Sequence, residues 1–134
     1  MANIYDMFSA SEKAAEGGKW FDIGDTIKVK IRRFKSKKSR EVREALEAPF
    51  KRFTKFGGSI PDDALERITT EHIAVGIVAD WKGITDRDGN ALAYSKEAAI
   101  KLFNELPEFR DAIVAISLDI ENYRDEEKEE VEGN

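Results

Sequence analysis

The sequence has no cysteine, a single histidine and three prolines among its 134 residues. Because cysteine is absent, the chain cannot form disulfides, present a thiolate nucleophile or build a zinc site from thiolates. His72 stands beside threonines on an apolar stripe, where a hydrogen-bonded packing role is expected. No Walker loop, dinucleotide-binding fingerprint or Gly-x-Ser-x-Gly motif occurs. We therefore expect a protein with no enzymatic activity, cofactor or metal ion.

Long hydrophobic runs are lacking as well. The longest is IAVGIVA at 73–79, far shorter than the roughly 20 residues that a membrane-spanning helix needs. The first ten residues, MANIYDMFSA, show neither the basic nor the apolar region of a secretory signal. We expect no membrane partner and a location in the cytoplasm.

The fold class follows from the spacing of the apolar residues. Ile27, Val29 and Ile31 alternate with basic residues, which is the pattern of a strand with one wet face. A turn at 24–25 predicts a β-hairpin at about 19–33. The rest of the chain is helical in pattern, so we expect a mainly α, small α+β domain of four to five helices with one N-terminal hairpin. This single domain covers residues 1–123, and residues 124–134 form an acidic, flexible C-terminal tail.

Helix starts are expected where a capping residue or a proline precedes an apolar stripe, at Ser9, Ser39, Pro61, Ser95 and Pro107. Pro49 predicts a kink or break in the second helix because it cannot donate to the carbonyl four residues earlier. The third helix is expected to run from about 59 to 83, with IAVGIVA buried at the centre of the domain.

Positive charge is concentrated in KVKIRRFKSKKSREVR, residues 28–43, where nine of sixteen residues are Lys or Arg. Residues 28–55 carry a net charge of +9, although the whole chain carries −5. Residues 119–132 hold eight acidic and two basic residues, a net charge of −6. The basic segment has three interpretations: a protein interface, a solvated face, or a nucleic-acid site. Interleaved glutamates and the lack of an exposed aromatic platform disfavour nucleic acid.

Two stretches, ASEKAAEGGKWFDIGDTIKVKIRR and VADWKGITDRDGNALAYSKEAAIKLFNELPEFRDAIVAISLDIENY, carry a family likeness. The features that carry it are Trp20 before a short hairpin, the Asp80-Trp81 pair, a turn at 88–89, and the Leu106-Pro107 joint. In this order they resemble the tail assembly chaperones of long-tailed (siphovirus-type) bacteriophages. Pro49, inside the second expected helix, departs from this family pattern, which does not require a proline there.

The resemblance implies a non-enzymatic, self-associating chaperone that binds and solubilises the tape measure protein and promotes tail-tube polymerisation around it. It also implies contact with the tail-tube protein, in some phages through a longer frameshifted product, and absence from the mature virion. Two alternatives stay open: a small nucleic-acid-binding regulator that uses residues 28–43, and a structural joining protein retained in the virion.

Self-association is expected from the two unlike charged regions. Contact between unlike surfaces gives rings or open spirals rather than closed dimers. The basic side is predicted to be Lys30, Arg32, Arg33, Lys37 and Lys38, and the acidic side Glu126, Glu127, Glu129 and Glu130.

The three phenylalanines after Pro49 are candidates for an apolar partner patch. Phe50, Phe53 and Phe56 are spaced three residues apart and follow the predicted helix break. Packing in the core is the favoured interpretation, because helical periodicity places Phe50 and Phe53 on the apolar stripe that Val42 and Leu46 begin.

Overall fold

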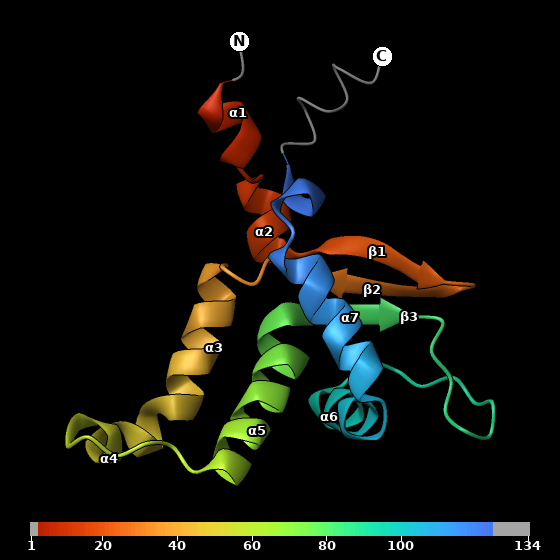
Figure 1. The fold of residues 1–134 in the computed structure, drawn as a ribbon. Helices are drawn as coiled ribbons and strands as arrows, with labels where there is room; N and C mark the ends of the chain where they lie inside the picture. The colour runs from red at the N-terminus through yellow and green to blue at the C-terminus, as the bar shows by residue number, and fades with distance from the viewer. Residues whose placement is uncertain (1–2, 125–134) are drawn as a thin grey trace.

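The computed structural model describes residues 3–124, which form a small α+β domain (Figure 1). Its elements, in chain order, are α1 (Ile4–Phe8), α2 (Glu12–Gly17), β1 (Lys19–Gly24), β2 (Ile27–Ile31), α3 (Lys37–Glu47), a 3₁₀ turn (Ala48–Phe50), α4 (Lys51–Lys55), α5 (Asp62–Glu71), a π-helical segment (His72–Ile77), β3 (Val78–Lys82), α6 (Lys96–Glu105), α7 (Pro107–Leu118) and a second 3₁₀ turn (Ile120–Tyr123). The predicted fold class is confirmed. The predicted acidic tail, except for Arg124, lies outside the described residues.

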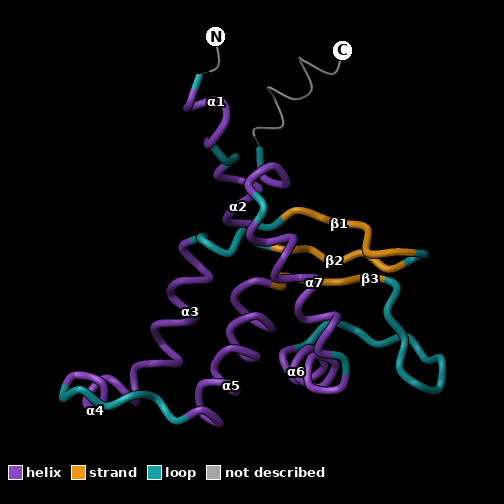
Figure 2. The backbone as a smooth tube through the Cα atoms, in the orientation of Figure 1, coloured by secondary structure: helices purple, strands orange, loops and turns teal. Residues whose placement is uncertain are grey.

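The sheet has three antiparallel strands in the order β1-β2-β3. The predicted hairpin is confirmed, with Phe21 opposite Val29 and Lys19 opposite Ile31. The central strand β2 also pairs with β3, which places Val29 opposite Trp81. Figure 2 shows the three strands side by side, with α3, α4 and α5 extending away from them. A hairpin alone is marginal in water, and the third strand supplies the support it needs.

The third strand was not predicted. The sequence predicted one helix from about 59 to 83, but α5 ends at Glu71, a π-helical segment follows, and Val78 begins β3. The prediction was wrong because a short, continuously apolar run fits a buried helix and a buried strand equally well. The Tyr94 hydroxyl donates to the Ala74 carbonyl at 2.8 Å, which satisfies an acceptor at this helix-to-strand change.

The core lies between one face of the sheet and the helices that pack on it, which are the π-helical segment, α6 and α7. Among its side chains that are fully excluded from solvent are Val29, Ile31, Ile77, Val78 and Ile113. Ala99 and Phe103 of α6 pack into the same cluster. The buried Tyr123 hydroxyl donates to the Ile31 carbonyl at 3.0 Å, which ties the second 3₁₀ turn to the end of β2.

Helix α3 packs closely on the π-helical segment at Gly76. A Cβ atom at Gly76 would lie 3.1–3.3 Å from atoms of His72, Val42 and Ser39, closer than nearly all real contacts. Glycine therefore lets these two helices approach each other. The close packing fixes the direction in which α3 leaves the body of the domain.

The helix starts differ in part from the predictions. Ser95 and Pro107 begin α6 and α7 as predicted, and α3 ends before Pro49, also as predicted. The caps of α2 and α3 are Ser11 and Ser36 instead of Ser9 and Ser39. Helix α1, capped by Asn3, was not predicted. Among residues 3–124, no helix is both long enough and apolar enough to cross a bilayer.

Candidate functional site

The candidate site is the arm formed by α3, the 3₁₀ turn and α4, followed by Phe56. At its root the Ser36 hydroxyl accepts from the Ser39 amide at 3.2 Å and caps α3. The Lys37 amide donates to both carboxylate oxygens of Glu16, at 2.9 and 3.0 Å. A side chain from α2 therefore satisfies another amide in the first turn of α3.

His72 holds the inner face of α3. Its Nε2 lies 2.7 Å from the buried Ser39 hydroxyl, and the Phe34 ring meets the imidazole edge-on with 5.5 Å between centroids. Burial lowers the pKa of His72 from its ordinary 6.5, and the charge of Arg43 lowers it further. The imidazole is thus a hydrogen-bonded packing group, as the sequence predicted.

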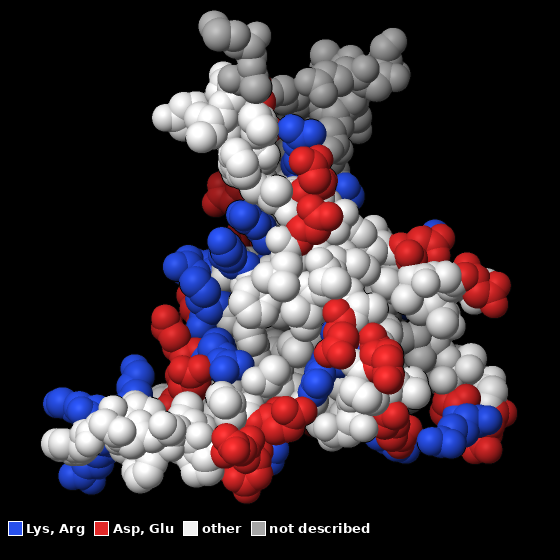
Figure 3. Space-filling view, in the orientation of Figure 1, with Lys and Arg blue, Asp and Glu red and all other residues white. Residues whose placement is uncertain are grey.

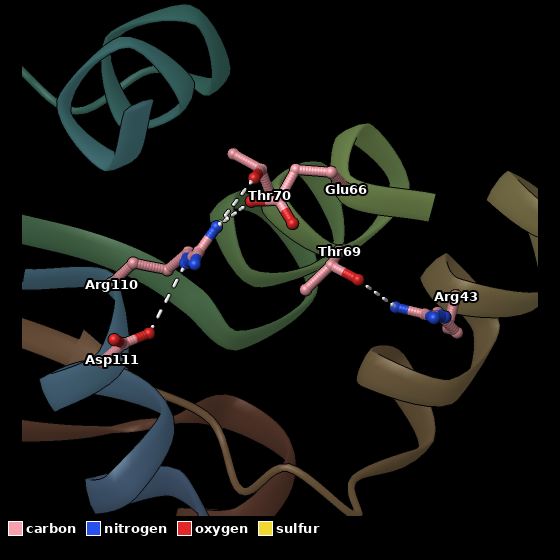
Figure 4. A network of polar contacts seen from close by, with 6 residues as sticks. All are labelled: Arg43, Glu66, Thr69, Thr70, Arg110 and Asp111. Carbon is pink, nitrogen blue, oxygen red and sulfur yellow. Dashed lines mark hydrogen bonds and ion pairs between the residues drawn. The ribbon is translucent and has the colours of Figure 1, made fainter. Parts of the chain in front are cut away.

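Two arginines clamp α5 from opposite sides (Figure 4). Arg43 of α3 donates from Nη1 to the Thr69 hydroxyl at 3.2 Å and pairs with Glu47 on its own helix. Arg110 of α7 donates from Nη1 to Glu66 at 2.7 Å and to the Thr70 hydroxyl at 3.3 Å. Helices α3 and α7 therefore hold α5 from its two sides, whereas α4 lies beyond these contacts.

The far end of the arm presents aromatic side chains to solvent. Phe53 is 56% exposed and Phe56 is 81% exposed, and no residue of α4 is buried. Phe50 is half-buried. We call Phe53, Phe56 and the basic residues of α4 (Lys51, Arg52 and Lys55) the α4 tip. The core-packing interpretation is wrong for Phe53 and Phe56, and whether either contacts a partner stays a prediction.

A glycine pair shapes the α4 tip. Gly57 has φ +88, and the Gly58 amide donates to the Phe53 carbonyl at 3.1 Å, so the turn closes the helix. A Cβ atom at Gly58 would lie 2.7 Å from the Phe53 ring. Phe53 can therefore lie over the turn only because residue 58 has no side chain.

Basic residues surround this aromatic pair. Lys51, Arg52 and Lys55 are all exposed. Figure 3 shows Lys and Arg gathered over α3 and α4, interrupted by a few acidic groups. From Lys37 to Phe56 the arm holds seven basic and three acidic residues, a net charge of +4. An apolar surface with this rim suits a partner that is apolar and acidic.

The predicted basic side of a self-association surface is spread over different environments. Lys37 and Lys38 are exposed on α3, and the Lys37 ammonium lies 3.9 Å from Glu41. Lys30 and Arg33 are half-buried. The predicted acidic partners, Glu126, Glu127, Glu129 and Glu130, lie outside the described residues. Their pairing with the basic side stays a prediction.

Arg32 requires a correction. Its Nε donates to the Glu16 carbonyl at 3.1 Å, and its Nη1 donates to the Val75 carbonyl at 3.1 Å. Nη1 also lies 3.5 Å from the carbonyls of Gly76 and Val78. Arg32 therefore satisfies carbonyls where the π-helical segment ends, and its guanidinium does not form part of a wet strand face.

A second exposed apolar surface, at the opposite end of the molecule, was missed. Helix α1 has no buried residue, and Tyr5 and Phe8 are 76% and 61% exposed. Beside it is a hollow of about 220 Å³ lined by Phe8, Arg33, Phe34, Lys35, Ser117, Leu118 and Ile120. The signal in the sequence was Asn3, a good cap before the apolar IYDMF.

Within residues 3–124, no three His, Asp or Glu side chains converge as metal ligands would. The exposed features of the described chain are apolar and charged surfaces, and these suit contact with another macromolecule.

The fold and these surfaces define a small α+β domain with exposed aromatic residues at both ends. Residues 34–134 match the model of a family described as YdaY prophage protein, so the chain belongs to this family and is phage-derived. The matched residues include α3 to α7 and β3, and they leave out α1, α2 and the hairpin. No curated protein and no solved structure matches the chain.

Proposed function

We propose that this protein is a tail assembly chaperone of a long-tailed bacteriophage, a non-enzymatic factor that binds the tape measure protein and keeps it soluble. The family assignment supports a phage-related role, and the resemblance of two long stretches to tail assembly chaperones supports the specific one. The chaperone acts in the host cytoplasm, promotes polymerisation of the tail tube and is absent from the mature virion.

The exposure of Phe53 and Phe56 is the observation that carries the proposal. A domain with a well-formed core still places two aromatic rings in solvent, at the end of an arm that extends away from that core. Exposed apolar groups rimmed by charge are typical of protein interaction sites. Tape measure segments expose apolar helical stripes until the tube encloses them, and such stripes bind other apolar helical surfaces.

Co-expression with the tape measure protein encoded by the same prophage tests the proposal. The wild-type chain should increase the soluble fraction of the tape measure protein, and the double variant Phe53→Ser/Phe56→Ser should not. The matched control is Leu106→Ser, which makes a similar change at a half-exposed position on the joint between α6 and α7. If wild type does not raise the solubility of the tape measure protein, the proposal fails.

Self-association belongs to the same proposal, as a ring or spiral of copies that also contacts the tail-tube protein, directly or through a longer frameshifted product. In this arrangement exposed Lys37 and Lys38 meet acidic residues of a neighbouring copy, namely Glu126, Glu127, Glu129 and Glu130. Because surface ion pairs are screened by salt, light scattering across a salt series should show smaller assemblies as salt increases. A strict monomer at high concentration would contradict this part.

A nucleic-acid-binding regulator is the second candidate, favoured by the exposed cations Lys35, Lys37, Lys38 and Arg40 at the start of α3. Glu41 and Glu44, also exposed on this helix, repel phosphate. A gel shift at moderate salt with Lys37→Glu/Lys38→Glu separates the two functions. Tight binding that this variant abolishes would favour the regulator. Arg32 should stay unchanged in the test, because its loss would disturb the fold.

A further inference from the structure

The molecule carries unlike apolar surfaces at its two ends. Helix α1 lies at one end and α4 at the other (Figure 1). Exposed side chains on α1 are Ile4, Tyr5, Met7 and Phe8, and those on the α4 tip are Phe53 and Phe56. Because these surfaces lie so far apart, one copy of the chain cannot cover its own α4 tip with its own α1.

Helix α1 is too short to be stable by itself. It has five residues, whereas isolated helices shorter than about 12 residues are marginal in water. Arg124 donates from Nη2 to the Asp6 carbonyl at 3.2 Å and supports the backbone from one side. None of the four apolar side chains is buried, so contact with a second apolar surface would stabilise the helix.

The charges at the two ends are complementary. The α4 tip carries three exposed cations, Lys51, Arg52 and Lys55. Asp6 lies within α1, and exposed acidic residues follow at Glu12 and Asp119, whereas Glu121 is paired with Arg124 at 3.2 Å. Attraction between opposite charges would orient the α1 end of one copy toward the α4 tip of another.

We propose that α1 of one copy docks on the α4 tip of a second copy, head to tail. The inference rests on the proposed function, because both place a binding partner on the α4 tip. In free copies α1 occupies the tip, and the tape measure protein then replaces α1. In this arrangement α1 acts as a stand-in for an apolar client helix and covers Phe53 and Phe56 until the client arrives. Repetition of the contact builds rings or spirals, since each copy offers one unlike surface at either end.

The contact is small, and this sets its strength. Five residues of α1 against a short helix cover far less than the roughly 1,200 Å² of a standard stable interface. The association should therefore depend on protein concentration and yield to a longer client helix. Such reversibility would let the chaperone assemble on its client without blocking the client site.

Two variants test the head-to-tail contact directly. Tyr5→Ser/Phe8→Ser removes the α1 surface, and Phe53→Ser/Phe56→Ser removes the α4 tip. Sedimentation velocity over a concentration series should show at least tenfold weaker self-association for either variant than for wild type. Circular dichroism checks that both variants keep their helical content. Wild-type self-association in either variant would overturn the proposal.

Mixing the two variants gives the sharpest test. The α1-defective chain (Tyr5→Ser/Phe8→Ser) keeps an intact α4 tip, and the tip-defective chain (Phe53→Ser/Phe56→Ser) keeps an intact α1. An equimolar mixture should therefore recover pairs but form nothing larger, because each pair uses the last intact surfaces. A mixture that stays monomeric while wild type assembles would show that the contact is not between α1 and α4.

A charge variant checks the orientation. Lys51→Glu/Lys55→Glu keeps both phenylalanines but makes the rim of the α4 tip acidic, so self-association should weaken by at least threefold at low salt. Lys101→Glu, an exposed cation of α6, is the matched control and should leave it unchanged. Equal effects of the two variants would count against the proposed docking.

The co-expression assay separates this inference from the proposed function. The α1-defective variant should still solubilise the tape measure protein, whereas the tip-defective variant should not. If the α1-defective variant self-associates normally and the tip-defective variant loses the client, the docking of α1 fails and the chaperone function stands. If both variants lose self-association but wild type does not raise the solubility of the client, the function fails and the contact between copies stands.

Discussion

The body of the domain and its two ends are built differently. In the body, Ile31, Ile77 and Ile113 are fully excluded from solvent, and Tyr123 donates from a buried hydroxyl to the backbone. Burial raises the pKa of Tyr123 far above its ordinary 10, so its hydroxyl stays a donor at every physiological pH. At the ends, α1 and α4 bury no residue, and aromatic rings on or next to these helices are exposed. The difference indicates that the body maintains the fold, whereas the side chains at the ends contribute little to it.

A core substitution should give the largest effect on stability. Phe103 is 1% exposed and contacts the Phe109 ring, with 5.5 Å between centroids. Phe103→Ala should lower the free energy of unfolding by about 3–5 kcal/mol, because it removes buried apolar area and leaves a cavity. Urea titration followed by circular dichroism measures the change. Phe56→Ala is the control at the exposed end, and an equal loss there would abolish the distinction between body and end.

The link between the sheet and the π-helical segment should give the next largest effect. Arg32→Met keeps most of the aliphatic stem but removes the donors to the carbonyls of Glu16 and Val75. We expect a loss of about 2–3 kcal/mol, since a charged donor is lost and carbonyls remain unpaired.

Lys38→Met is the control for Arg32→Met, because it removes an exposed cation from the same basic segment. It should change the free energy of unfolding by less than about 0.5 kcal/mol. If Arg32→Met caused an equally small change, the hydrogen bonds of Arg32 would not stabilise the fold, and Arg32 would count as a surface cation like Lys38.

The sequence predicted the parts of the body in which local pattern decides structure. Alternating apolar residues at 27, 29 and 31 predicted the hairpin, and Pro49 and Pro107 predicted where helices end and begin. The strand at 78–82 was missed because its pairing with β2 depends on contacts distant in sequence. Serines three residues apart offered two caps for α3, and the carboxylate of Glu16, which binds the first turn, lies on another helix.

The candidate site was predicted less well, for a physical reason. Helical periodicity placed Phe53 on the apolar stripe of the preceding helix, but Pro49 breaks that helix and turns the ring toward solvent. The sequence also could not distinguish Arg32 from its exposed neighbours, because its acceptors are backbone carbonyls that every residue carries. Exposure and backbone partners are properties of the folded chain.

The joint between body and arm should respond to pH through His72. Its pKa is lower in the folded chain than the ordinary 6.5, so the unfolded chain binds more protons as pH falls below that value. The contribution of neutral His72 to stability is therefore complete above pH 6.5 and is lost as pH falls toward and through the folded-state pKa. One proton limits the slope to about 1.4 kcal/mol per pH unit.

Comparison with His72→Gln separates the effect of His72 protonation on stability from the effect of carboxylate titration. The glutamine amide can still bond the Ser39 hydroxyl but does not titrate. Urea midpoints at pH 7.5, 6.5 and 5.5 should fall more steeply for wild type than for the variant. Parallel curves would mean that protonation of His72 does not weaken the joint between α3 and the body.

The smallest effect on stability is expected where the functional effect is largest. Phe56→Ser should change the free energy of unfolding by no more than about 0.5 kcal/mol, because an 81% exposed ring loses little contact with the fold when it is removed. The same variant should reduce both client solubilisation and self-association, which depend on that ring in the proposals above. Urea titration and sedimentation of one purified sample measure the two properties together. A ring whose removal destabilises the fold belongs to the body, whereas one whose removal changes only association belongs to the partner surface.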